Sequence, residues 1–291
     1  MMDIHIHTNY SDGQYSPNDI IKLANKNGVS ILSITDHDTV SGIDFGKKIA
    51  KEISITFIPG IEISVTGNKE LHILGYYVDD KNNSLIDLCN KALQSREHMK
   101  KRIFEYLKSQ NIELEEGNIM KQTAGRMIGR PHFALALLEA GYVSSFQDAF
   151  EKYLSSPELL TVDRAKPSPY DAIQVILNAN GVPVLAHPAL LGLDNYALDM
   201  IVSELKNYGL AGIECFYSTH TPEQVAFYLK LAKKYKLLVT CGSDFHGEKI
   251  SPNKSLGGCG QDLSISEIQE IYNCLRSAQE DPSYSFYSYR C

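Results

Sequence analysis

The alternation of strand-like and helix-like segments restricts this chain to few folds. Runs typical of β-strands occur near residues 3–8, 29–35, 55–65, 71–78, 183–186, 211–216 and 237–241. Helical patterns lie between most of them, and this order predicts parallel βα units. Seven such runs are enough to close a sheet on itself. We therefore expect an α/β protein with a barrel rather than an open sheet.

A long segment in the middle of the chain breaks this alternation. Residues 80–165 carry helical patterns only, over 84–110, 131–140 and 146–154. We interpret this segment as an all-helical insertion domain at residues 81–164. The barrel domain is then discontinuous and consists of residues 1–80 and 165–291.

Composition and charge exclude several classes of protein. The chain has 291 residues and a formal net charge of −7, which is not the electrostatic footprint of a duplex-DNA binder. No apolar run approaches the roughly 18 residues of a membrane helix. The six cysteines form no CxxC pair, and Asp3, His5 and His7 stand where a signal peptide would carry a basic and then an apolar run. We expect a cytoplasmic protein with no membrane association and no obligate protein partner.

Histidine and acidic residues gather where the predicted strands end. His5 and His7 flank Ile6 on one strand, so both imidazoles point to the same face. Asp12 lies in the loop after this strand, and the other candidates follow later strands, except Glu62, which lies between apolar neighbours within a strand, and His72, which begins one. The full set of candidates is His5, His7, Asp12, His37, Glu62, His72, His187, Asp244 and His246.

Several of these residues have a structural explanation when taken singly. Glu62 can be a half-buried strand residue, His72 a surface residue, and Asp244 a turn former beside Gly242. These explanations do not account for the position that the residues share at the ends of strands. In a barrel the strand ends converge on one mouth, so these side chains should meet there. Converging carboxylates and imidazoles cost several kcal/mol in desolvation unless a cation lies among them. The sequence therefore predicts a metal site.

Local motifs at these positions resemble a known family, the polymerase-and-histidinol-phosphatase (PHP) family of metal-dependent phosphoesterases. The matching stretches are Asp3-Ile4-His5-Ile6-His7-Thr8, Ser11-Asp12-Gly13, Thr35-Asp36-His37-Asp38, Gly60-Ile61-Glu62, His72, Gly129-Arg130-Pro131-His132, Ala186-His187-Pro188 and Gly242-Ser243-Asp244-Phe245-His246. The resemblance implies a distorted (β/α)7 barrel, the PHP fold, with two to three divalent metals at the strand C-termini.

The resemblance also implies three ligand sets. The first metal would be held by His5, His7, Glu62 and Asp244; the second by Glu62, His72 and His187; the third by Asp12, His37 and His246. Three divalent ions and three carboxylates give a site of about +3, which attracts phosphate and stabilises its transition state. A hydroxide bridging two metals is the implied nucleophile. Asp12, His37, Glu62, Asp244 and His246 are the implied catalytic residues. Mn, Zn and Fe all suit such ligands, and the general acid stays open.

Substrate contacts are predicted from Arg130 and His132 first. A guanidinium matches phosphate geometry, and Pro131 begins a helix whose free N–H groups attract anions; the alternative for Arg130 is a surface arginine that caps a loop. Arg164, Lys166 and His220 are further candidates. The Gly129-Arg130-Pro131-His132 segment, together with the helical insertion, most resembles that of nucleoside 3′,5′-bisphosphate phosphatases and 5′-3′ exoribonucleases. This implies a phosphorylated small nucleotide, or a short RNA with a 5′-phosphate, as substrate.

Three other functions remain as alternatives. A histidinol-phosphate phosphatase would share the metals but not the helical insertion. An amidohydrolase that cleaves C–N bonds would also begin with His-x-His, but it does not need the third set of Asp12, His37 and His246. A non-catalytic module, like those kept in some polymerases, would not need every ligand position to be present.

Overall fold

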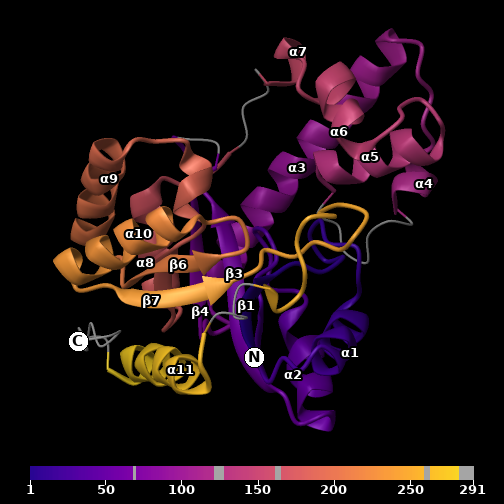
Figure 1. Cartoon of the computed structure of the whole chain (residues 1–291). Coiled ribbons are helices and arrows are strands. Elements are labelled where there is room, and N and C mark those ends of the chain that lie inside the picture. Colours follow the sequence, from indigo (N-terminus) through magenta and orange to yellow (C-terminus); the bar gives the residue numbers. More distant parts are fainter. Residues whose placement is uncertain (68–69, 121–127, 161–164, 259–262, 282–291) are drawn as a thin grey trace.

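The strands follow one another around a single sheet in chain order, from β1 to β7 (Figure 1). The computed structural model describes residues 1–67, 70–120, 128–160, 165–258 and 263–281. The strands of these residues are β1 Met2–Ile6, β2 Ile31–Ile34, β3 Thr56–Ser64, β4 His72–Tyr76, β5 Val182–Leu185, β6 Gly212–Tyr217 and β7 Leu238–Gly242. A parallel bridge between Ile6 and Phe245 joins the first edge to the last. The expected α/β barrel is confirmed.

One strand runs against the others. β4 is antiparallel to both β3 and β5, whereas the other neighbouring strands are parallel. The expectation of parallel βα units is therefore wrong at this strand. Only residues 65–71 connect β3 to β4, and a parallel pair needs a crossover of a dozen or more residues. As a result His72, at the start of β4, lies at the same end of the sheet as the carboxyl ends of the parallel strands.

Helices surround the sheet and begin at defined caps. Ser16, Ser168 and Thr221 each precede a proline and accept a hydrogen bond from a backbone N–H of the first turn. The helices around the barrel are α1 Pro17–Lys26, α2 Ile43–Glu52, α8 Pro169–Asn178, α9 Asn195–Asn207, α10 Pro222–Tyr235, α11 Ile265–Glu280 and the 3-10 helix η2 Pro188–Leu191.

The segment between β4 and α8 forms a helical lobe beside the barrel (Figure 1). Its elements are α3 Asn83–Ser109, α4 Glu116–Met120, α5 Arg130–Glu139, α6 Phe146–Ala149, the π-helix η1 Phe150–Leu154 and α7 Pro157–Leu160. The long helix α3 belongs to two cores. Leu85 and Leu88 pack with the barrel, whereas Ile103 and Leu107 pack with Phe133 in a separate core. One helix thus ties the lobe to the barrel.

The two faces of β1 differ in chemistry. Met2, Ile4 and Ile6 are buried in apolar clusters, whereas Asp3 and His5 are buried among polar groups. This alternation is what a strand period of two residues requires. Among the described residues, no helix is both long and apolar enough to cross a membrane.

Candidate metal centre

Glu62 lies at the centre of the predicted ligands. This fully buried carboxylate places Oε1 2.9 Å from both His72 Nδ1 and His187 Nε2. Its other oxygen, Oε2, lies 3.3 Å from His5 Nε2, 3.2 Å from His7 Nε2 and 3.1 Å from His37 Nδ1. Five imidazoles from four separate parts of the chain thus surround a single carboxylate.

The remaining candidates complete one continuous cluster. Asp244 Oδ1 lies 3.1 Å from His7 Nε2 and 3.4 Å from His246 Nδ1. His246 Nε2 lies 3.4 Å from Asp12 Oδ1, and Asp12 Oδ2 lies 4.0 Å from His37 Nε2. The structure therefore brings together all nine residues that the sequence singled out.

The charges of this cluster are strongly coupled. Burial raises carboxyl pKa values, but nearby imidazoles outweigh it and hold the pKa of Asp12 and Glu62 well below their usual values. The Lys254 ammonium, followed by the imidazoles, does the same for the pKa of Asp244. Burial lowers the pKa of His37 to about 3, despite the opposing charges of Glu62 and Asp12. Burial has the same sign at His7, but Asp244 and Glu62 raise its pKa to about 10. The site thus has three ionised carboxylates at neutral pH.

Several buried atoms of the cluster have no hydrogen-bond partner within the described part of the chain. They include His5 Nε2, His7 Nε2, Asp12 Oδ1, His37 Nδ1 and Glu62 Oε2. Buried polar atoms are normally paired, so a set that converges without partners fits a cation. Imidazole nitrogens and carboxylate oxygens are ligands of Zn, Mn and Fe.

The ligand atoms form three overlapping groups, within each of which they lie no more than 4.8 Å apart. These groups are His5, His7, Glu62 and Asp244; His37, Glu62 and His72; and His7, Asp12, His37 and His246. The first has the membership expected from the sequence. The second contains His37, and the expected member His187 also lies close, with its Nε2 3.3 Å from His72 Nδ1 and 2.9 Å from Glu62 Oε1. The third also includes His7.

Side chains that the sequence did not single out support the cluster. Glu214, fully buried, accepts a hydrogen bond from His5 Nδ1 at 3.0 Å. Tyr217 OH and Lys254 Nζ donate to Asp244 Oδ2 at 2.9 and 2.6 Å. The sequence carried one signal, because Gly212-Ile213-Glu214 repeats the Gly-Ile-Glu of the β3 motif. Tyr217 and Lys254 had no comparable signal.

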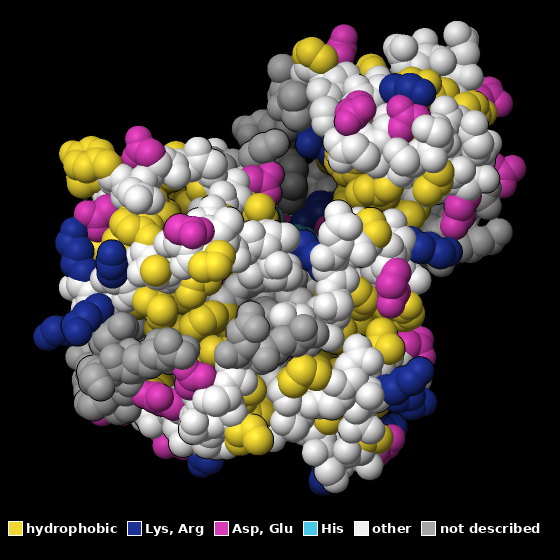
Figure 2. All heavy atoms as spheres, viewed as in Figure 1, with side chains coloured by type: hydrophobic (Ala, Val, Ile, Leu, Met, Phe, Trp, Pro, Cys, Tyr) yellow, Lys and Arg dark blue, Asp and Glu magenta, His cyan; other side chains and the backbone are white. Residues whose placement is uncertain are grey.

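The helical lobe brings basic residues to the mouth of the barrel. Arg96 of α3 donates to the buried Asp38 at 2.7 Å, next to His37 in the sequence. His132 is buried at the start of α5 and accepts the Gly129 N–H through Nδ1. Burial lowers the pKa of His132, and the negative charge of Asp12 opposes this shift. Arg130, half buried, donates to the Leu159 carbonyl at 3.2 Å. Figure 2 shows Lys or Arg side chains deep in the hollow between the lobe and the barrel.

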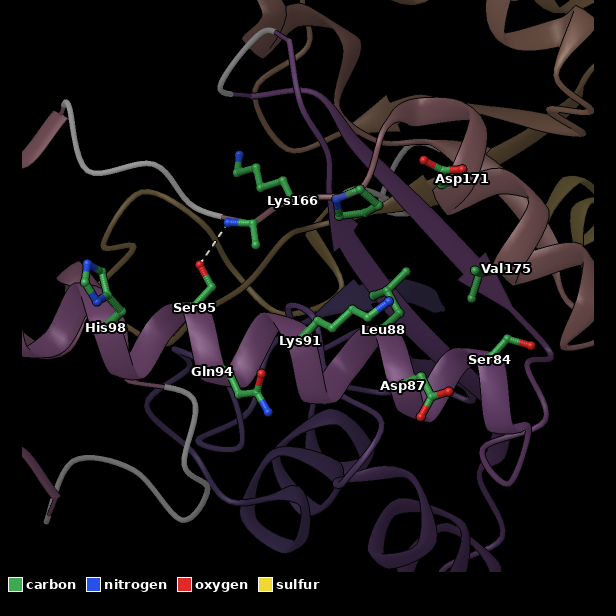
Figure 3. Close-up of a pocket in the computed structure, with 12 residues that line it drawn as sticks. Ser84, Asp87, Leu88, Lys91, Gln94, Ser95, His98, Lys166, Asp171 and Val175 are labelled. Carbon is green, nitrogen blue, oxygen red and sulfur yellow. Dashed lines mark hydrogen bonds between the residues drawn. The ribbon is translucent and has the colours of Figure 1, made fainter.

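Two of the predicted substrate contacts, Lys166 and His220, lie outside the cluster. Lys166 lines a groove of about 770 Å³ between α3 and α8 with Lys91, His98 and Asp171, and none of the nine ligands lines it (Figure 3). His220 donates from Nδ1 to the Cys215 carbonyl at 2.9 Å, and its ring packs against Tyr217. Arg164 lies outside the described residues.

Comparisons with known proteins agree with this geometry. The model of the PHP domain matches residues 3–157. The 5′-3′ exoribonuclease Rnm of Escherichia coli is 31% identical, and the alignment covers 84% of each chain. A phosphoribosyl 1,2-cyclic phosphate 1,2-diphosphodiesterase of Eggerthella lenta is 29% identical over 84% of this chain and 94% of its own. A 3′,5′-nucleoside bisphosphate phosphatase of Chromobacterium violaceum is 28% identical over 84% and 87%.

Solved structures share the whole architecture. A Bifidobacterium adolescentis protein assigned to the metal-dependent phosphoesterases superposes with a TM-score of 0.80 at 31% identity, over 94% of this chain and 95% of that one. A Chromobacterium violaceum protein described as an amidohydrolase, with bound sulfate, has the same TM-score at 26% identity, over 94% and 96%. Both matches extend through the helical lobe as well as the barrel.

Proposed function

This chain belongs to the PHP domain family and is a metal-dependent hydrolase of phosphate esters, and we propose that its substrate is a small phosphorylated nucleotide or the 5′-phosphate end of a short RNA. The observation that carries the proposal is the convergence of Glu62 and eight other buried or half-buried His and Asp side chains on one site. The proposed ligands are those nine residues, and they hold two to three divalent ions.

The protein groups have distinct proposed roles. When bound, the metal ions activate water and neutralise the charge of the phosphate. The nine ligands fix the positions of the ions, and the three carboxylates among them leave the loaded site with a net positive charge. Asp244 is itself held in place by Tyr217 and Lys254, which occupy its second oxygen.

Arg130 and His132 are the proposed phosphate contacts. Arg130 is half buried and donates a hydrogen bond to a carbonyl rather than to a carboxylate, which leaves its charge without an acidic partner among the described residues. A desolvated guanidinium gains free energy by binding an anion in its plane. His132 accepts the Gly129 N–H at Nδ1, so its neutral form carries a proton on Nε2, a buried donor near Asp12.

The remaining assignments stay proposals. Arg164, Lys166 and His220 are proposed substrate contacts further from the metals, and the domains are proposed to divide at residues 80/81 and 164/165. A C–N hydrolase is not favoured, because the named relatives act on phosphate esters and the set around Asp12 has no part in that chemistry.

A side-by-side assay of phosphate and mononucleotide release tests the proposal, because hydrolysis of RNA from its 5′ end yields nucleotides rather than free phosphate. The substrates are AMP, adenosine 3′,5′-bisphosphate, a 5′-phosphorylated oligoribonucleotide, a ribose cyclic phosphate and histidinol phosphate, each with added Mn²⁺. The proposal expects turnover of one of the first three to exceed that of histidinol phosphate at least tenfold. Preference for histidinol phosphate, or no release from any of them by metal-loaded protein, would refute it.

A further inference from the structure

Strand β6 carries none of the nine proposed ligands, yet the side chain of its Glu214 is hydrogen-bonded to two of them, His5 and His187. Glu214 Oε1 and Oε2 lie 3.0 and 3.2 Å from His5 Nδ1. Oε2 also accepts the backbone N–H of His187 at 2.7 Å. Glu214 is fully buried, so these contacts are shielded from water. One carboxylate therefore contacts a proposed ligand of the first metal and a proposed ligand of the second.

The contact with His5 determines which ring nitrogen is available. A carboxylate only accepts hydrogen bonds, so His5 Nδ1 must carry the proton that it donates to Glu214. The free lone pair is then on Nε2, the nitrogen that faces Glu62 Oε2 at 3.3 Å and Asp244 Oδ1 at 3.6 Å. Hydrogen bonding at the remote nitrogen is the usual way in which proteins set the tautomer of a metal-binding histidine.

The contact with the His187 N–H stabilises a backbone conformation that is unfavourable by itself. His187 has φ 27° and ψ 61°, a conformation that side-chain-bearing residues rarely adopt. The Glu214 Oε2 hydrogen bond fixes its N–H, and the ring Nε2 then lies 2.9 Å from Glu62 Oε1. Without that acceptor, the backbone is free to relax and to withdraw the ring from Glu62.

The neighbouring strand leaves room for this arrangement. Gly242 of β7 faces Glu214 and His5, and a Cβ at this position would lie 2.6 Å from Glu214 Oε1 and 2.1 Å from His5 Cβ. Only glycine allows β6 and β1 side chains to meet here, which indicates that the packing around Glu214 serves this contact.

We propose that Glu214 is a positioning residue that sets the His5 tautomer and the His187 backbone together, so that it couples two metal-binding groups. The proposal rests on the metal centre assigned above, but not on the identity of the substrate. A carboxylate serves both contacts better than an amide, because Oε1 accepts from His5 at 3.0 Å while Oε2 accepts the His187 N–H at 2.7 Å. A glutamine would have to accept both bonds through one oxygen, and its NH₂ group would face the His5 Nδ1 proton.

The test compares Glu214→Gln with Glu105→Gln, whose side chain is exposed on α3. Mn²⁺ titration of each folded protein should give a 10- to 100-fold weaker affinity for Glu214→Gln and an unchanged affinity for Glu105→Gln. Excess Mn²⁺ should restore part of the metal content, which a purely structural lesion would not allow. Equal affinities in both variants, with Glu214→Gln folded, overturn the proposal.

A measurement on the wild-type chain covers the case in which Glu214→Gln does not fold. In Zn²⁺-loaded protein, long-range ¹H–¹⁵N spectra should show His5 coordinated through Nε2 with its proton on Nδ1. Coordination through Nδ1 contradicts the proposal whatever the variant does. Neither readout uses a substrate, so failure of the proposed function and failure of this inference give different results.

Discussion

Glu62 Oε1 lies 2.9 Å from His187 Nε2, although 125 residues separate them in the chain. The whole helical lobe lies between them in sequence, and it departs from the barrel after β4 and returns before β5. The lobe therefore does not interrupt the metal centre. It places the start of α5, with Arg130 and His132, beside the mouth of the barrel, where a substrate has to enter.

Replacement of a ligand tests the role of the cluster in hydrolysis. His7→Ala removes an imidazole that lies 3.2 Å from Glu62 and 3.1 Å from Asp244. We expect phosphate release to fall to background because two ligand groups lose a shared member. Glu105→Ala, on an exposed part of α3, is the control and should retain full activity. Equal turnover in the two variants would remove His7 from the site.

Metal binding should release protons. Asp244 and Glu62 raise the His7 pKa to about 10, so this imidazole is charged at pH 7, and it must lose its proton before it coordinates a metal. Metal affinity should therefore increase with pH between 7 and about 10. Calorimetry of Mn²⁺ binding at pH 7, in two buffers of different ionisation enthalpy, should show release of about one proton or more. Identical heats in both buffers contradict this expectation.

Arg130 should act on substrate binding. A charged hydrogen bond to phosphate contributes about 1.5–3 kcal/mol, so Arg130→Ala should lower kcat/KM by about 10- to 100-fold, mainly through KM. Arg102→Ala, whose side chain is exposed on α3, provides the control. If steady-state kinetics give the same KM and kcat for both variants, Arg130 does not contact the phosphate.

Gly242→Ala should distort the metal centre from within the sheet. The added Cβ has to displace His5 and Glu214, and overpacking of this kind costs about 1–3 kcal/mol. Thermal unfolding should show a lower Tm and weaker stabilisation by Mn²⁺. Gly117→Ala, in helix α4, meets nothing within 4 Å and should leave the stabilisation by Mn²⁺ unchanged, with a Tm equal to or above that of the wild type. A Gly242→Ala protein with wild-type Tm and metal response would show that the close approach is dispensable.

The sequence predicted the barrel and the ligands for the same physical reason. Residues such as His37 and Asp244 directly follow short apolar strands, and strand ends converge when the sheet closes. The reversed direction of β4 was missed, although the loop of residues 65–71 is too short for a parallel crossover. The number of residues between the third and fourth predicted strands was the signal that could have revealed this direction.

The supporting residues depend on tertiary structure that local patterns do not reveal. Glu214 lies inside a strand rather than at its end, and only the repeated Gly-Ile-Glu distinguishes it. Lys254 reaches Asp244 from a loop, and Arg96 reaches Asp38 from the middle of a long helix. Neither the loop that carries Lys254 nor the helix that carries Arg96 has a sequence pattern that indicates contact with the metal centre. Their roles could be recognised only in the folded structure.

Metal content tests the central claim most directly. The wild-type protein, loaded with Mn²⁺ and freed of excess ion, should retain two to three equivalents per chain by elemental analysis, and His7→Ala should retain fewer. A wild-type protein that is fully folded and yet retains no divalent ion at the Glu62 cluster would contradict the account.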